Sequence, residues 1–119
     1  MPGKILVYGS YGYTGDLIAR FAKADEVDVV LSGRNSERLR EQAERYGLES
    51  VPADLSNPES IRKVLRDKEV VIHCAGPFAH TYKAMARACL ETGTHYTDIT
   101  GEAEVFQGRR YLTDAVIQG

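Results

Sequence analysis

The sequence predicts a doubly wound α/β fold, with a mostly parallel five-stranded sheet and helices on both faces. Short runs of β-branched and other apolar residues alternate along the chain with amphipathic stretches of helical spacing. Strands joined by helices of roughly 10–15 residues pair in parallel through right-handed crossovers, which distribute the helices over both faces. The chain has 119 residues, enough for one such domain.

The first two strand–helix units follow from apolar runs and helix signals. Strands are expected at residues 4–8 and 28–32, and a helix at 36–46 that ends at Gly47, a residue suited to a left-handed C-cap. The helix after the first strand is expected to bury one apolar stripe. That stripe consists of Leu17, Ile18, Phe21 and Ala22.

The second half of the chain repeats the alternation. A strand at 49–53 precedes Asn57 and Pro58, an N-cap and a proline suited to the first helical position. The run at 70–74 is apolar throughout, as expected of a central strand covered on both faces. A fourth helix, a fifth strand at 96–99 and a last helix from residue 102 onward complete the pattern.

Composition and charge argue against several kinds of partner. Fifteen basic and seventeen acidic residues give a net charge of −2 without a dense basic block, so nucleic acid is not an expected partner. Apolar runs stay far short of the ~20 residues that span a bilayer, so no membrane association is expected. The first residues lack a secretory pattern, which favours a cytoplasmic location. Cys74 and Cys89 match no metal-ligand spacing and are expected to be reduced packing residues.

A glycine-rich loop follows the first predicted strand and opens the first helix. Its G-x-x-G-x-x-G pattern consists of Gly9, Ser10, Tyr11, Gly12, Tyr13, Thr14 and Gly15. Such glycines allow a tight turn and a close approach of backbone N–H groups to a pyrophosphate, as in Rossmann-like folds. The position between strand and helix favours a dinucleotide site over a glycine turn without a ligand.

The end of the second strand indicates which dinucleotide is preferred. Here stand Ser32, Arg34 and Asn35, where NAD-specific folds usually place an acid for the ribose 2′-hydroxyl. A guanidinium can instead pair with a 2′-phosphate and stack on adenine. The sequence therefore favours NADP, with NAD possible and a merely solvated arginine as the alternative.

Two further loops are expected to contribute to the cofactor site. Asp54, after the third strand, can accept a hydrogen bond from the adenine amino group, although an Asx turn explains it equally well. Small residues after the fourth strand let the backbone approach the ribose and pyrophosphate. The predicted contacts in this loop are Ala75, Gly76, Pro77 and Phe78.

These motifs together resemble the N-terminal NAD(P)-binding domain of saccharopine dehydrogenase-like proteins. The Gly76-Pro77-Phe78 loop and the segment 93–102, GTHYTDITGE, are the more specific parts of a resemblance that covers about residues 4–106. It implies an NAD(P)-dependent oxidoreductase that transfers a hydride to or from a small-molecule substrate. Family members continue into a second domain that completes the substrate site. Residues 1–119 are therefore expected to be an excised dinucleotide-binding domain that is inactive alone, with self-association possible.

No catalytic residue is assigned from the sequence. His80, Asp98 and Glu102 follow the relevant strands, but a surface histidine, a strand-end turn and a helix N-terminal acid explain them as well. His73 and His95 are expected to be packed and hydrogen-bonded. The Tyr/Lys pair of short-chain dehydrogenases is missing, which leaves a non-catalytic NAD(P)-sensing regulator related to short-chain reductases as the alternative function. A structural domain with a vestigial loop is a third option.

Overall fold

The protein folds into a five-stranded sheet in the order β3-β2-β1-β4-β5, with every neighbouring pair parallel. A computed structural model describes residues 5–76 and 78–98, without the side chains of residues 78 and 79. The elements are β1 (Ile5–Tyr8), α1 (Tyr13–Ala24), β2 (Val30–Gly33), α2 (Ser36–Tyr46), β3 (Glu49–Pro52), α3 (Pro58–Leu65), β4 (Val70–His73), α4 (Phe78–Thr92) and β5 (His95–Asp98). This order confirms the predicted doubly wound fold.

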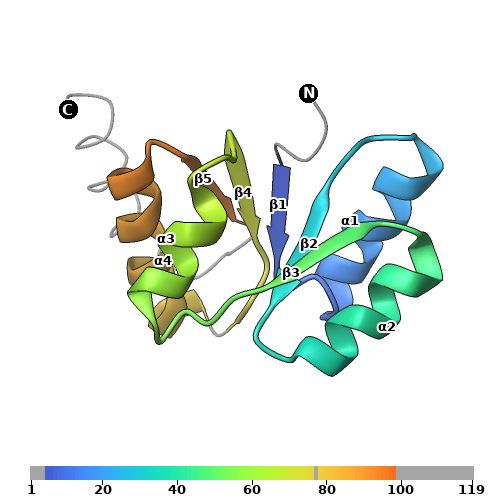
Figure 1. Cartoon of the computed structure of the whole chain (residues 1–119), viewed down its shortest axis with the longest axis horizontal. Coiled ribbons are helices and arrows are strands. Elements are labelled where there is room, and N and C mark those ends of the chain that lie inside the picture. The colour runs from blue at the N-terminus through green and yellow to red at the C-terminus, as the bar shows by residue number, and fades with distance from the viewer. Residues whose placement is uncertain (1–4, 77, 99–119) are drawn as a thin grey trace.

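The helices cover both faces of the sheet (Figure 1). Helices α1 and α2 lie on one side, and α3 and α4 lie on the other. Successive residues of β1 point to opposite faces, so Leu6 belongs to the core under α3 and α4, and Val7 belongs to the core under α1 and α2. Strand β4 is an interior strand between β1 and β5, while β1 occupies the middle of the sheet.

Local capping explains where the helices begin and end. Asn35 accepts a hydrogen bond from the Arg38 N–H at the start of α2, and Asn57 accepts one from the Ser60 N–H at the start of α3. Gly47 ends α2 in the left-handed conformation, with φ 64°. The predicted bounds of α2 are thus confirmed, and β2 begins two residues later than predicted. The predicted last helix lies outside the described residues.

Helix α1 is rotated relative to the sequence-based prediction. Phe21 was expected in its buried stripe, but 67% of this residue is exposed. The buried positions are instead Gly15, Ala19 and Ala22. A Cβ at Gly15 would lie 2.4 Å from the Gly9 carbonyl oxygen, so the helix approaches the strand too closely for large residues on its inner face. Small residues therefore face the sheet, and the prediction for Phe21 is wrong.

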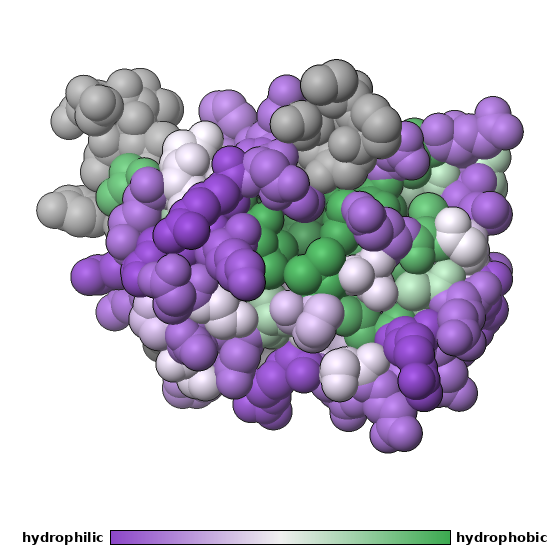
Figure 2. Space-filling model, in the orientation of Figure 1, coloured by the Kyte–Doolittle hydropathy of each residue, from purple (hydrophilic) through white to green (hydrophobic). Residues whose placement is uncertain are grey.

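The surface between the two helical layers is partly apolar. Figure 2 shows hydrophobic surface in the middle of the view, bordered by hydrophilic side chains. Strand β3 is an edge strand, and its Val51 is only partly buried against the core.

No helix within residues 5–76 and 78–98 has the length and apolar character needed to span a membrane.

The turn after α1 has a strained backbone conformation at Glu26. Glu26 has φ 56°, in the region that favours glycine, while the Val27 N–H donates to the Ala22 carbonyl to close the helix end. Glu26→Gly is expected to raise the free energy of unfolding by about 0.5–1 kcal/mol, since relief of strain outweighs the added freedom of the unfolded chain. Urea unfolding measures the change, and Gly47→Ala serves as the opposite control, with an expected loss. A less stable Glu26→Gly protein would contradict this interpretation.

Candidate functional site

A cleft of about 620 Å³ opens where the carboxyl ends of four parallel strands meet. It is lined by Gly9 and Gly12 after β1, Arg34 after β2, Asp54 after β3 and Ala75 after β4. Strand order reverses at β1, since β2 follows on one side and β4 on the other. Parallel α/β sheets bind their ligands at such a reversal point, so this cleft is the candidate site.

The three glycines of the glycine loop have different surroundings. Gly9 has φ 79°, and a Cβ there would lie 2.7 Å from the Ala75 backbone nitrogen. Gly15 brings α1 against the loop, as described above. Gly12 is different, because the nearest atom to a Cβ would be the Gly9 carbonyl oxygen at an ordinary 3.4 Å. The space beside Gly12 therefore belongs to the cleft.

Helix α1 begins at this cleft without a capping side chain. Gly12 is its N-cap residue and makes no side-chain hydrogen bond, whereas asparagines cap α2 and α3. The first turn of a helix has N–H groups without intrahelical acceptors, and the helix dipole adds partial positive charge there. The start of α1 thus offers the donors that a pyrophosphate accepts.

Tyr11 connects the glycine loop to the turn between β2 and α2. Its hydroxyl accepts a hydrogen bond of 2.8 Å from the Asn35 N–H, and the Arg38 guanidinium lies 4.7 Å from the ring centroid. A Cβ at Gly33 would lie 2.5 Å from the tyrosine ring, so the ring lies flush against the β2 backbone. The ring and Arg38 both line the cleft. Arg38 was not among the residues predicted from the sequence. It could have been found from its position in the first turn of the predicted helix, four residues after Arg34.

Several predicted contact residues use their side chains within the protein. The Ser10 hydroxyl donates to the Gln42 side chain, the Ser32 hydroxyl donates to the Val51 carbonyl, and the Asn35 side chain caps α2. Their backbone groups also have partners, since the Ser10 N–H donates to the Ser32 carbonyl and the Asn35 N–H donates to the Tyr11 hydroxyl. Whether they contact the cofactor stays a prediction.

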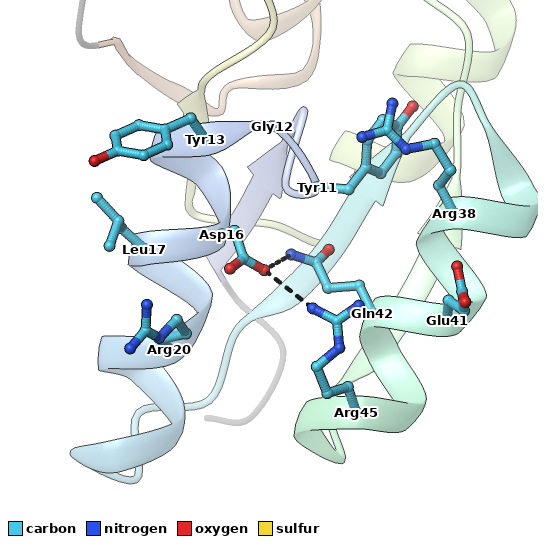
Figure 3. A pocket seen from close by; sticks show the side chains of 10 residues that line it. All are labelled: Tyr11, Gly12, Tyr13, Asp16, Leu17, Arg20, Arg38, Glu41, Gln42 and Arg45. Atoms are coloured by element: carbon cyan, nitrogen blue, oxygen red, sulfur yellow. Dashed lines mark hydrogen bonds and ion pairs between the residues drawn. The ribbon is translucent and has the colours of Figure 1, made fainter.

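The side chain of Tyr13 lies outside the cleft. The residue is 86% exposed and lines a second hollow of about 330 Å³ between α1 and α2 (Figure 3). Tyr13, Thr14 and Gly15 can serve the cleft through the N–H groups of the first helical turn. Among the predicted residues after β4, Ala75 and Gly76 line the cleft. Pro77 and the Phe78 side chain lie outside the described residues.

Asp54 forms the Asx turn that the sequence allowed, and it also lines the cleft. Its carboxylate accepts hydrogen bonds from the Ser56 N–H at 2.9 Å and the Ser56 hydroxyl at 2.8 Å, which is the predicted Asx turn. The same residue lines the cleft beside Leu55. The Ser56 hydrogen bonds, and to a smaller degree the nearby Arg34 guanidinium, lower the pKa of Asp54. An ionised acceptor is therefore present at this end of the cleft.

The loop after β4 is held by a buried histidine. His73 Nε2 lies 3.0 Å from the Thr81 hydroxyl oxygen, and that hydroxyl donates to the Ala75 carbonyl at 2.9 Å. Because the hydroxyl has one hydrogen, Nε2 must carry the imidazole proton and donate it. His73 is thus packed and hydrogen-bonded as predicted, whereas His95 is exposed at the start of edge strand β5, contrary to the prediction. His80 is exposed and lines the cleft, as a surface histidine.

Cys74 is a half-buried thiol and Cys89 a buried one. Burial raises the pKa of Cys74 to about 11, with a smaller contribution from the Asp98 carboxylate, and burial raises that of Cys89 to about 12. Both therefore stay protonated near neutral pH, consistent with the predicted packing role. Within residues 5–76 and 78–98, no group of three or more His, Cys, Asp or Glu side chains is arranged to hold a metal ion.

Comparison with known proteins identifies the domain. The family model described as "Saccharopine dehydrogenase NADP binding domain" matches residues 5–116. The chain belongs to this family. The domain therefore binds a nicotinamide dinucleotide, as the glycine loop and the uncapped α1 indicate, and the resemblance found in the sequence is confirmed.

Relatives of the domain are much longer proteins. The chain is 33% identical over 105 residues to the trans-acting enoyl reductase of Mycobacterium leprae, with 82% of this chain and 25% of that protein covered. It is 25% identical over 125 residues to the saccharopine dehydrogenase-like oxidoreductase of Homo sapiens, with 89% of this chain and 29% of that protein covered. The chain thus spans between a quarter and a third of the length of these relatives.

A solved structure shows the same fold. The Citrobacter sp. triphenylmethane reductase complexed with NADP(H) superposes with a TM-score of 0.79 at 21% identity, over 96% of this chain and 46% of that protein. At this identity the likeness concerns the fold alone. It shows that the domain has the Rossmann-type architecture.

Gly12→Val is expected to abolish binding of both NADPH and NADH while the domain stays folded. The backbone of Gly12, with φ −74° and ψ 175°, is allowed for valine, so the fold tolerates the change. The branched side chain instead fills the part of the cleft where the loop backbone meets the pyrophosphate. Isothermal titration measures binding, and far-ultraviolet circular dichroism checks the fold. Unchanged binding by a folded variant would mean that the loop is only a turn.

The stability of the domain is expected to fall in mild acid because of His73. Burial lowers the pKa of His73 from 6.5 to about 4, against a smaller opposing effect of Asp98. The unfolded chain takes up the proton below about pH 6.5, while the folded domain resists it until about pH 4. The free energy of unfolding therefore decreases as pH falls through this window, by up to about 3 kcal/mol.

The His73→Gln variant is the test of this pH dependence. Glutamine can still donate to Thr81 but does not titrate, so its unfolding free energy should depend less steeply on pH between 6.5 and 4. Urea unfolding at three pH values in this window compares the two proteins. Equal slopes would show that another group is responsible.

Proposed function

We propose that the domain binds NADP(H) in preference to NAD(H) and serves an oxidoreductase that acts on a small molecule. The observation that carries the preference is Arg34, which lines the cleft at the end of β2 where NAD-specific folds have an acid. Arg38 lines the same region from the first turn of α2, with its guanidinium over the Tyr11 ring. Two guanidinium groups at this end of the cleft suit a 2′-phosphate, which a carboxylate would repel.

The remaining residues suit the other parts of the dinucleotide. The start of α1 and the Gly12 backbone suit the pyrophosphate, and Asp54 with Leu55 suits the adenine. Ala75 and Gly76 are small, so their backbone suits close approach of the nicotinamide and its ribose, beside the exposed His80. The nicotinamide, when bound, supplies or accepts a hydride. What these residues do is bind and orient it.

The enzyme interpretation is favoured over the NAD(P)-sensing regulator. Relatives that align with most of this chain are named as a reductase and an oxidoreductase. In such an enzyme the substrate is held near the nicotinamide for hydride transfer. Positioning of this kind is worth about 7–11 kcal/mol of an activation barrier.

The preference for NADP(H) is tested by comparing the two reduced cofactors. The parent chain should bind NADPH more tightly than NADH and show a larger rise in melting temperature at equal concentration. Arg34→Asp should weaken NADPH binding by roughly 10–100-fold, the loss expected for charge-assisted hydrogen bonds, and leave NADH binding nearly unchanged. Titration of intrinsic nicotinamide fluorescence gives both dissociation constants.

Arg40→Asp is the matched control. Arg40 is an exposed arginine like Arg34, but it stands within α2, lines a separate hollow with Glu37 and Glu41, and does not line the cleft. The same change of charge there should leave the NADPH preference intact. Equal affinity of the parent chain for NADPH and NADH would overturn the assignment, and so would an equal effect of the two substitutions.

A further inference from the structure

Gln42 is a buried amide at the contact between α1, α2 and the glycine loop. Only 2% of the residue is exposed. Its Nε2 donates to the Ser10 carbonyl at 2.7 Å and to Asp16 Oδ1 at 2.9 Å, and its Oε1 accepts from the Ser10 hydroxyl at 2.7 Å. A carbonyl and a carboxylate only accept, which defines the orientation of the amide. Both amide hydrogens and the amide oxygen are thus engaged.

The partners of Gln42 bracket the cofactor-facing part of the loop. Ser10 precedes residues 11–15, and Asp16 follows them in the first turn of α1. Ser10 is fully buried, and its N–H and that of Gly9 both donate to the Ser32 carbonyl, at 3.2 and 2.8 Å. The loop is therefore held to β2 through its backbone and to α2 through Gln42. Without Gln42, a buried carbonyl and a buried hydroxyl would lose their partners.

Asp16 gives the same contact an electrostatic role. Its carboxylate stands in the first turn of α1, near the donors proposed for the pyrophosphate. Besides Gln42, the Tyr46 hydroxyl donates to this carboxylate at 2.9–3.0 Å, and Arg45 lies 3.9 Å away. Figure 3 shows Asp16 turned toward Gln42 and Arg45 on α2. Donors on α2 therefore keep a negative charge directed away from the cleft.

We propose that Gln42 is a positioning residue for dinucleotide binding, which acts through Ser10 and Asp16 to hold the glycine loop in its pyrophosphate-binding conformation. This inference rests on the proposed function. Because α2 also carries Arg38 and begins directly after Arg34 and Asn35, one helix sets the relative position of the pyrophosphate and 2′-phosphate ends of the cleft. Gln42 itself does not line that cleft, so its effect must pass through the loop.

Gln42→Leu separates a positioning role from a structural one. Leucine keeps the approximate volume and removes all three hydrogen bonds. Dissociation constants for NADPH, NADH and adenosine 2′-monophosphate are measured well below the melting temperature of each protein. NADPH and NADH should both bind about tenfold more weakly or worse. Adenosine 2′-monophosphate has no pyrophosphate and should bind within about twofold of the parent value.

Thr94→Val is the control for loss of a buried hydrogen bond. Thr94 is 3% exposed, donates to the Leu65 carbonyl at 3.1 Å and does not line the cleft. This variant should melt at a lower temperature and bind all three ligands as the parent does. Ser10→Ala, which removes only the hydroxyl contact to Gln42, is the milder second variant. It should weaken NADPH and NADH severalfold and spare adenosine 2′-monophosphate, even if Gln42→Leu fails to fold.

Three outcomes overturn the inference while the proposed function stands. The first is a folded Gln42→Leu variant that melts earlier and binds both dinucleotides normally, like Thr94→Val. The second is equal weakening of all three ligands, which indicates general loss of the site. If Gln42→Leu does not fold, unchanged binding by Ser10→Ala overturns it. A parent chain that binds neither dinucleotide refutes the proposed function, and this inference falls with it.

Discussion

The rest of the structure depends on the close approach of three backbone segments: the glycine loop, the loop after β4 and the start of α1. The glycine loop contacts the β4 loop at Gly9 and the start of α1 at Gly15, both at distances that leave no room for a Cβ. Protein interiors pack too densely to absorb such overlaps without moving an element. With glycine at these positions, α1 can begin directly above the point where the strand order reverses. The uncapped helix end and the cleft are direct results.

Helix α2 determines the relative position of the proposed pyrophosphate and 2′-phosphate ends of the cleft. It is the most polar of the helices in the described residues, and it makes specific contacts with the loop, through Gln42, and with the Tyr11 ring, through Arg38. Polar contacts of this kind are directional, so they define both a distance and an orientation. An apolar helix face would hold the same elements together with less control over the loop.

On the opposite side of the cleft, the loop after β4 is held by hydrogen bonds from His73 and Thr81. His73 lies near the rings of Tyr8 and Tyr96, at centroid distances of 5.9 and 6.1 Å. Its Nε2–H donates to the Thr81 hydroxyl, which in turn donates to the Ala75 carbonyl. Burial keeps this imidazole neutral, which is the form that can serve as both a rigid packing group and a hydrogen-bond donor. The domain thus combines an electropositive end, near Arg34, with an uncharged wall after β4.

The sequence by itself determined the features that depend on neighbouring residues. Periodicity predicted the strands and helices, Gly47 predicted the end of α2, Asn57 and Pro58 predicted the start of α3, and the glycine loop and Arg34 were recognised from their place after a strand. These signals are local, because capping, turn geometry and backbone freedom act within a few residues.

Only the tertiary structure decided which side chains face each other. Phe21 points outward because α1 lies too close to the sheet for a large residue, and His95 is exposed because it starts an edge strand. The contact of Gln42 with Ser10 joins residues 32 positions apart, and its geometry depends on how α2 is rotated against the loop. Periodicity gives the spacing of a stripe but not its rotation against a neighbour. That rotation is decided by packing among segments distant in the chain.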